Sequence, residues 1–213
     1  MKNKIDLGAK VAPYPMPVVL VGANVNGKAN FLAVAWFMQA ARTPPKVAVA
    51  LNKRHYTNLG IKENKTFSVC IPSEDMVEAA DYCGLVSGHK ADKSMVFDVF
   101  FGKLKTAPMI AACPVNLECS LDKVVDTGSN EVFIGDIVST YTEEKYLTNE
   151  AVDLKKTKPF ILSLNDKTYY VLGKPKAKAW SAGKTFKPWE LPFNSKELTE
   201  FQKKTLKSLS SNS

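Results

Sequence analysis

The chain has 213 residues, of which 45% are hydrophobic and 23% are charged. These values are typical of a globular protein with one large domain, or a domain with an arm. No apolar run approaches the roughly 18–20 residues that span a bilayer, and the basic N-terminus lacks the apolar region and cleavage site of a signal peptide. We therefore expect a cytoplasmic protein without a membrane partner.

The net charge of +8 is unevenly distributed along the chain. Residues 174–213 contain nine lysines and three glutamates, and therefore carry +6 of this charge. A basic tail can bind nucleic acid or another anionic partner. This tail has no arginine and no aromatic RNA-binding motif, which favours a solvated surface and disfavours nucleic acid as a partner.

The first predicted element is a β-hairpin centred on Asn26-Gly27, the strongest short hairpin signal. The run that follows, "FLAVAWFM", is apolar on both faces if it is a strand, so both faces should be buried. An Ala-rich helix competes with this interpretation because the run has no clean period. The preceding turn favours the strand.

Further along the chain, the alternation of apolar runs and turn residues predicts several short strands. They cover residues 46–52 and 66–72, two strands around a turn at 127–130, and a hairpin at 159–173 with its turn at Asn165-Asp166. Helices are predicted from Thr57 as a possible N-cap, over residues 73–84, and at 198–209 after an Asn194/Glu197 capping box. This pattern is typical of a β-barrel with appended helices.

Two loops have the chemistry of anion-binding sites. In "LNKRHYTNLGI", Arg54, His55 and Thr57 lie between a strand end and a helix start, where free amides and the helix dipole favour an anion. In "GLVSGHKADKS", Ser87 and Gly88 can present backbone amides beside Lys90 and Lys93. The plain alternatives are a capped helix with an exposed arginine and an ordinary basic loop. Together with the apolar strand, the loops predict a phosphorylated aromatic ligand.

Other kinds of site find no support in the sequence. There is no complete P-loop, no G-x-G-x-x-G dinucleotide fingerprint and no G-x-S-x-G nucleophile elbow. The two histidines have no spaced ligand partners, so no metal site is predicted. The four cysteines show no C-x-x-C spacing, and reduced structural thiols are the expectation for a cytosolic chain.

Four stretches in order resemble the flavin reductase-like, FMN-binding split-barrel family, and its flavoredoxin branch in particular. They are "PVVLVGANVNGKANFLAVAW", "PPKVAVALNKRHYTNLGIKENKTFSVCIPS", "GLVSGHKADKS" and "CPVNLECSLDKVVDTGSNEVFIGDIV". With "YYVLGK" they cover roughly residues 12–175. The resemblance implies a mainly β fold: a six-stranded antiparallel Greek-key split barrel over residues 1–175, which forms a homodimer with FMN near the interface. Residues 176–213 would then be a lysine-rich arm.

The resemblance also implies which residues bind FMN. One group would border the isoalloxazine ring: Asn30, Phe31, Leu32, Ala33, Val34, Ala35 and Trp36. A second group, Asn52, Arg54 and Thr57, would hold the phosphate or ribityl chain, and Ser87, Gly88 and Lys93 would complete the phosphate and ring contacts. Family members often carry Thr or Ser in the stretch after the asparagine, whereas "FLAVAW" is wholly apolar, so a hydroxyl contact to the ring is absent here.

We therefore predict that the protein is an FMN-dependent oxidoreductase that takes a hydride from NADH or NADPH and passes electrons to an acceptor. Hydride transfer requires ring alignment and a shielded pocket rather than an acid–base residue, so no catalytic residue is named. The alternative is a non-enzymatic FMN-binding electron carrier, with a redox protein as partner at the lysine-rich face. A basic module that binds nucleic acid without flavin is a third hypothesis, and it predicts salt-sensitive binding.

Overall fold

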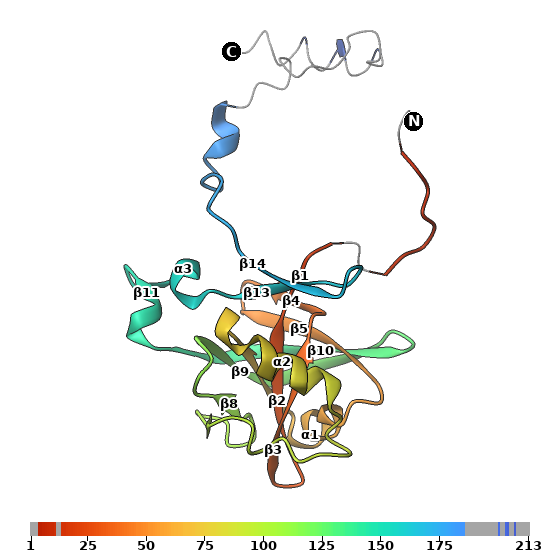
Figure 1. Cartoon of the computed structure of the whole chain (residues 1–213), viewed down its shortest axis with the longest axis vertical. Helices are drawn as coiled ribbons and strands as arrows, with labels where there is room; N and C mark the ends of the chain where they lie inside the picture. The colour runs from red at the N-terminus through yellow and green to blue at the C-terminus, as the bar shows by residue number, and fades with distance from the viewer. Residues whose placement is uncertain (1–3, 12–13, 186–199, 201–202, 205–206, 208–213) are drawn as a thin grey trace. The chain divides into compact units, whose positions relative to one another are not determined.

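The computed structural model describes residues 4–11, 14–185, 200, 203–204 and 207 (Figure 1). The chain divides into two compact units, Met1–Leu172 and Gly173–Ser213, and each is described by itself. All the site residues predicted from the sequence belong to the first unit. No helix in the described part of the chain is long and apolar enough to cross a bilayer.

The first unit is built on a seven-stranded antiparallel sheet with the order β3-β2-β6-β9-β10-β5-β4. Its strands are β2 (Val19–Val25), β3 (Lys28–Val34), β4 (Phe37–Ala41), β5 (Lys46–Asn52), β6 (Thr66–Ile71), β9 (Val115–Asp126) and β10 (Asn130–Thr142). Asn26 and Gly27 join β2 to β3 with φ values of 52° and 79°, the left-handed conformation that a two-residue hairpin turn requires. The hairpin and the strands predicted from the sequence are confirmed.

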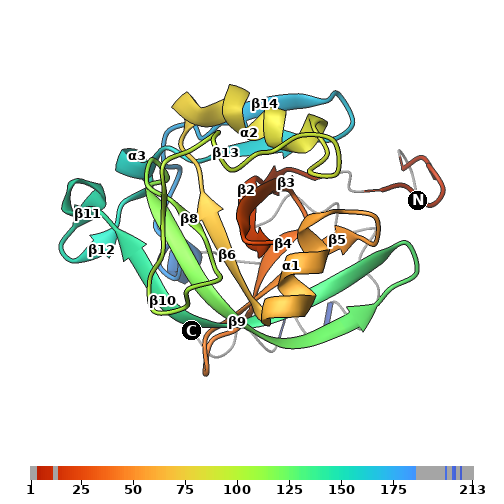
Figure 2. The ribbon, with the colours of Figure 1, turned by 90° about the horizontal axis from the view of Figure 1, so that it is seen from below.

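The sheet is rolled, as the path of the chain between its two edges shows. β3 and β4 are the edge strands, yet only Ala35 and Trp36 separate them in sequence. The Ala50 amide donates to the Trp36 carbonyl at 2.9 Å, so this short connection stays beside β5. Figure 2 shows the strands wrapped around a common centre. The mainly β antiparallel fold is confirmed, but the predicted barrel of six strands has seven, and no ladder between β3 and β4 closes it within the described residues.

Strand β3 has a hydrophobic cluster on each face. Leu32 and Val34 contribute to the cluster enclosed by the rolled sheet, which also contains Phe67 and Phe133. Phe31 points to the other side and joins a second cluster with residues of α2 (Val77–Leu85) and of β8 (Met109–Ile110). The predicted burial on both faces is confirmed for β3. It is wrong for the end of the predicted strand, because β3 ends at Val34, and Trp36 and Met38 are 43% and 60% exposed.

The helices begin differently from what the sequence suggested. Helix α1 (Thr57–Asn64) has Tyr56 at its N-cap, so Thr57 is the first helical residue and not the cap. The predicted helix at 73–84 starts as a 3-10 turn, η1 (Glu74–Met76), and α2 then runs through Gly84 to Leu85. Ser73 makes no capping hydrogen bond with its side chain. The clustered acids and the glycine located this helix approximately, but they did not predict the residues at which it begins and ends.

Smaller elements complete the first unit. The predicted hairpin at 159–173 is present as β13 (Phe160–Ser163) and β14 (Thr168–Val171), and β13 also pairs with β1 (Met16–Pro17) in a three-stranded sheet. The remaining elements are β7 (Val99–Phe100), η2 (Glu144–Tyr146), β11 (Leu147–Thr148), β12 (Ala151–Val152) and α3 (Leu154–Thr157). All four cysteines are buried free thiols.

In the second unit, the described residues include the short element η3 (Ala182–Thr185), and residues 200, 203–204 and 207 are helical. Most of the helix predicted at 198–209 lies outside the described residues. Within the described part of that stretch, Lys203 Nζ lies 2.7 Å from Glu200 Oε1.

Candidate cofactor-binding site

A cavity of about 280 Å³ lies where three segments of the first unit meet: the start of β3, the turn before α1, and the loop after α2. It is lined by residues 25, 28–30, 56 and 88–93. Three of the residues predicted to bind FMN are among them, namely Asn30, Gly88 and Lys93. The structure thus brings together the apolar strand and the two loops that the sequence had singled out separately.

Gly88 explains why the loop can approach the strand so closely. A Cβ atom at this position would lie 2.5 Å from Asn30 Oδ1 and 2.5 Å from Tyr56 Cδ1, which no side chain can tolerate without a shift of the loop. The neighbouring His89 ring meets the Tyr56 ring edge-on, with 4.8 Å between their centroids. Glycine at position 88 therefore lets the loop backbone form a wall of the cavity.

Asn30 and Thr57 are joined by a buried hydrogen bond. Asn30 Nδ2 donates to Thr57 Oγ1 at 2.7 Å, and both residues are buried. The threonine hydroxyl thereby fixes the orientation of the Asn30 amide at the cavity wall. Thr57 does not itself line the cavity, so its contribution to the site in this structure is to position Asn30.

Lys93 carries a positive charge into the interior of the site. Its side chain is only 2% exposed, and its Nζ donates to the Cys83 carbonyl at 3.1 Å, its one acceptor within the described residues. Burial lowers the pKa of Lys93, while the Cys83 thiolate would act in the opposite direction. A buried ammonium group with donors to spare is costly unless an anion meets it, and Lys93 lines the cavity. The residues present therefore fit a ligand with an anionic group.

His55 lies in the turn next to this charge. Its pKa is lowered, first by burial and then by the positive charge of Lys93. Its Nδ1 atom is buried and has no hydrogen-bond partner within the described residues. Burial and the nearby ammonium group both disfavour the charged form of the imidazole.

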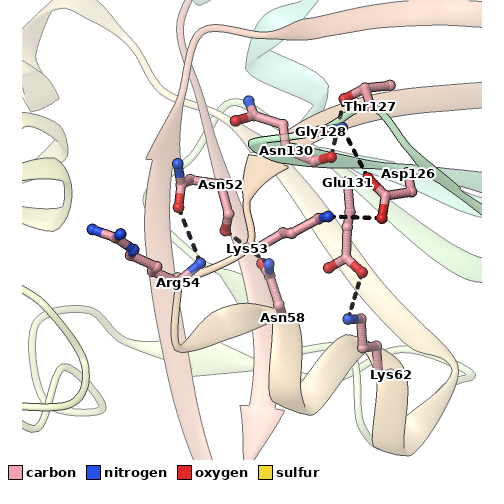
Figure 3. Close-up of polar contacts among 10 residues, drawn as sticks. All are labelled: Asn52, Lys53, Arg54, Asn58, Lys62, Asp126, Thr127, Gly128, Asn130 and Glu131. Atoms are coloured by element: carbon pink, nitrogen blue, oxygen red, sulfur yellow. Dashed lines mark hydrogen bonds and ion pairs between the residues drawn. The ribbon is translucent and has the colours of Figure 1, made fainter.

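The rest of this turn has a structural role (Figure 3). Asn52 Oδ1 accepts from the Arg54 amide at 3.0 Å, and the Asn52 carbonyl accepts from Asn58 Nδ2 at 2.9 Å. Lys53 pairs with Asp126 at 2.7 Å, which ties the turn to the β9–β10 hairpin. The Arg54 side chain is exposed and extends away from this cluster. Asn52 and Arg54 do not line the cavity.

The residues predicted to border the flavin ring, Asn30 to Trp36, do not all lie at the first cavity, because some of them line a second one. Ala35 and Trp36 line a separate cavity of about 210 Å³, together with residues 14, 16–17, 37–38, 48, 50 and 132. From Asn30 to Trp36 an extended chain spans roughly 20 Å, so the two cavities lie toward opposite ends of β3. Phe31, Leu32 and Val34 face the hydrophobic clusters, and Ala33 packs against the second of them.

Ser87, the remaining predicted residue, is exposed, and its Oγ accepts from the His89 amide at 3.3 Å. Sequence reasoning gave no site role to Lys28, Tyr56 or Asp92, although all three line the first cavity. Tyr56 and Asp92 fall within the two loops predicted to bind an anion, so their position in the sequence could have marked them as candidates. Lys28 is an exposed lysine beside a hairpin turn, a position that signals nothing by itself.

Comparison with known proteins decides the family. Residues 11–169 match the family described as "Flavin reductase like domain". The chain belongs to this family. Among solved structures, the flavoredoxin from Methanosarcina acetivorans is 47% identical with a TM-score of 0.84, and the alignment covers 85% of this chain and 98% of that one. The flavoredoxin of Desulfovibrio vulgaris (Miyazaki F) is 34% identical with a TM-score of 0.79, covering 85% and 100%.

Sequence relatives are more distant. An uncharacterized protein of Aeropyrum pernix is 30% identical over 136 residues, which are 62% of this chain and 52% of that protein. The chain therefore matches about half the length of this relative. An "NADH-dependent FAD reductase" of Streptomyces globisporus is 22% identical over 139 residues, covering 65% of this chain and 76% of that protein. The match to the flavin reductase-like family and its flavoredoxin branch is confirmed.

Proposed function

We propose that the protein is an FMN-binding oxidoreductase that passes electrons from NADH or NADPH through bound FMN to an acceptor. Its family assigns it a flavin-binding redox role. The observation that carries the choice of FMN is the first cavity, where the buried ammonium group of Lys93 offers a partner to a terminal phosphate.

The proposal gives three residues of the first cavity distinct tasks. Lys93 supplies the positive charge for an anionic group of the cofactor. Asn30, held by Thr57, presents an oriented amide, and Gly88 allows the loop backbone to approach. FMN, when bound, supplies the chemistry of accepting a hydride and releasing electrons. The protein's contribution is to align the cofactor and shield it from water.

A homodimer is part of the proposal. The second cavity is surrounded by exposed apolar side chains, with Tyr14 at 60%, Trp36 at 43% and Met38 at 60% exposure. A cluster of this kind on one face of a protein is typical of an interaction surface. The choice of a nicotinamide donor is supported by the Streptomyces globisporus relative, whose description names NADH.

The second candidate is a non-enzymatic FMN-binding electron carrier with a redox protein as its partner. The observation in its favour is the 47% identity to a flavoredoxin over 85% of the chain, which exceeds the 22% identity to the reductase from Streptomyces. Both candidates need the same flavin site. They differ in whether a nicotinamide nucleotide reduces the flavin.

The test begins with the visible absorption spectrum of the purified chain, followed by titration with FMN. Flavin bands, or binding of FMN in preference to riboflavin, are expected, and a protein that ignores FMN would overturn both candidates. The FMN-loaded protein is then mixed with NADH or NADPH under anaerobic conditions. Bleaching of the flavin by either nucleotide, with turnover when an acceptor is added, supports the oxidoreductase. Tight FMN binding without reduction by either nucleotide would favour the carrier.

A further inference from the structure

We propose that the ion pair between Lys28 and Asp92 makes the site selective for FMN, which ends in a single phosphate, over flavin adenine dinucleotide (FAD). This inference rests on the proposed FMN-binding function and adds which residues discriminate between the two flavins. Lys28 Nζ lies 2.6 Å from Asp92 Oδ2. The pair joins the first residue of β3 to the loop after α2, and both residues line the first cavity.

The cavity has a buried end and a solvent end. Lys28 and Asn30 are two residues apart on β3, so their side chains leave the same face of the strand, roughly 7 Å apart. Asn30 and Lys93 are buried, whereas the side chains of Lys28 and Asp92 are 68% and 44% exposed. The ion pair therefore connects the two walls of the cavity at the end that opens to solvent.

The loop that carries Asp92 is held at both ends of the cavity. At the buried end, Gly88 packs directly on Asn30 and Tyr56. At the solvent end, Asp92 Oδ2 accepts a hydrogen bond from Lys28 Nζ, and Asp92 Oδ1 accepts one from the Ser94 amide at 2.9 Å. The loop cannot lift from the strand at its outer end without breaking the ion pair. A long ligand that leaves through this end has to displace it.

The position of the charges and the size of the cavity favour a ligand that ends inside. Three lysines and one aspartate line the cavity, Lys28, Lys90, Lys93 and Asp92, which leaves two positive charges in excess. This excess suits the phosphate groups of either flavin, so discrimination depends on the place of the Asp92 carboxylate at the solvent end and on the space available. The volume of about 280 Å³ is small for a ligand pocket. If the phosphate of FMN lies at Lys93 and the ligand continues past the Lys28–Asp92 pair, the second phosphate of FAD would meet the Asp92 carboxylate. Like charges at such short range repel.

The experiment measures the affinity of the full chain for FMN, FAD and riboflavin by flavin fluorescence. Wild-type protein is expected to bind FMN at least tenfold more tightly than FAD. Asp92→Ala removes both the carboxylate and the ion pair, and it is expected to lower the ratio of FMN affinity to FAD affinity about tenfold. The exchange of both residues, Lys28→Asp with Asp92→Lys, rebuilds an ion pair and should restore the preference. Glu74→Ala is the matched control, because it removes the carboxylate of the exposed Lys158–Glu74 pair at 3.0 Å.

The outcomes separate this inference from the function beneath it. If the protein binds FMN but Asp92→Ala keeps the wild-type FMN-to-FAD ratio within twofold, the inference is overturned and the flavin site stands. The inference is also overturned if the wild-type protein binds FAD or riboflavin as tightly as it binds FMN. If no flavin binds, the proposed function fails, and the inference fails with it. Thermal melting checks that each variant folds, and Asp92→Asn, which removes only the charge, replaces the alanine variant if that one does not.

Discussion

Lys93 holds a charged group at a buried position whose only described acceptor is a neutral carbonyl. Burial lowers its pKa from the usual 10.5, because the charged form loses hydration there. An anionic ligand at the cavity would favour the charged form again. The FMN complex should therefore bind this proton more tightly than the free protein does, and such a difference makes FMN affinity depend on pH.

We expect FMN affinity to be constant while Lys93 is protonated in the free protein, and to fall as the pH rises through its lowered pKa toward 10.5. The sign follows because binding above that pKa has to take up a proton. Lys93→Met should weaken FMN binding by about 1–3 kcal/mol at neutral pH and remove this decline. Titrations over a pH series measure both effects, with Lys178→Met, an exposed lysine of the second unit, as control. A decline that persists in Lys93→Met would assign it to another group.

Gly88 gives a second prediction at this scale. Gly88→Ala would place a methyl group 2.5 Å from Asn30 Oδ1 and Tyr56 Cδ1, so the loop has to move away from β3. Because the loop forms one wall of the cavity, we expect FMN affinity to fall about tenfold or more, with only a small change in melting temperature. Gly173→Ala is the control, since a Cβ there meets nothing within 4 Å. FMN binding at wild-type strength in Gly88→Ala would place the cofactor elsewhere.

Strand β3 and the connection that follows it lie in two environments, and the aromatic residues Phe31 and Trp36 should report them separately. Phe31 is fully buried and packs edge-on against Phe97, with ring centroids 5.5 Å apart, whereas Trp36 is 43% exposed at the second cavity. Phe31→Ala should lower the free energy of unfolding by about 3–5 kcal/mol. Trp36→Ala should cost much less in the isolated subunit, roughly 1 kcal/mol, because much of its side chain is already in water.

Urea unfolding of the two variants, compared at low protein concentration, measures this difference. If Trp36 lies in a dimer interface, as proposed, Trp36→Ala should also lower the apparent molecular mass seen by light scattering at a concentration where the wild type is dimeric. Equal losses of stability for the two variants, without a change in mass, would contradict the assignment of Trp36 to a surface and return it to the core.

The elements also show what the sequence could predict. The Asn26-Gly27 turn and the alternating apolar runs identified the strands, because local conformation and burial leave a direct pattern in the residues. The pairing of β1 with β13 left no such pattern, since it joins Met16 to Leu162 through two short strands. A seventh strand, β4, was missed because its residues Phe37–Ala41 are partly exposed at a sheet edge and follow Trp36 without a turn signal.

The candidate site was predictable in its inner half. Gly88 and Lys93 stood in a loop whose composition already pointed to an anion, whereas Asn30 was assigned through the family resemblance, and the fold brings the three residues to one cavity. Lys28 and Asp92 are an ordinary exposed lysine and aspartate until the fold places them 2.6 Å apart. Conversely, Trp36 follows Asn30 closely in sequence, yet the extended strand carries it to the other cavity. Proximity along a strand is therefore a poor guide to membership of one site.

At the scale of the whole molecule, the two units have different characters. The residues of the candidate site and both hydrophobic clusters belong to the first unit. The second unit carries most of the net charge, and its described lysines at 174, 176, 178 and 184 are exposed. FMN should therefore stabilise the first unit selectively, because a ligand stabilises the part of the protein whose folded form it needs.

We expect FMN at a hundred times its dissociation constant to add about 2.7 kcal/mol to the stability of the first unit, which raises its melting temperature by roughly 5–10 °C. Riboflavin, which lacks the phosphate, should raise it less. Hydrogen–deuterium exchange locates the effect: amides at 28–34, 54–60 and 87–94 should gain protection on FMN binding, and those at 174–185 should not. Protection at 174–185 would contradict this division, since it would show that the lysine-rich unit takes part in holding the cofactor. A shift in melting temperature that is equal for FMN and riboflavin would remove the phosphate from the role given to Lys93.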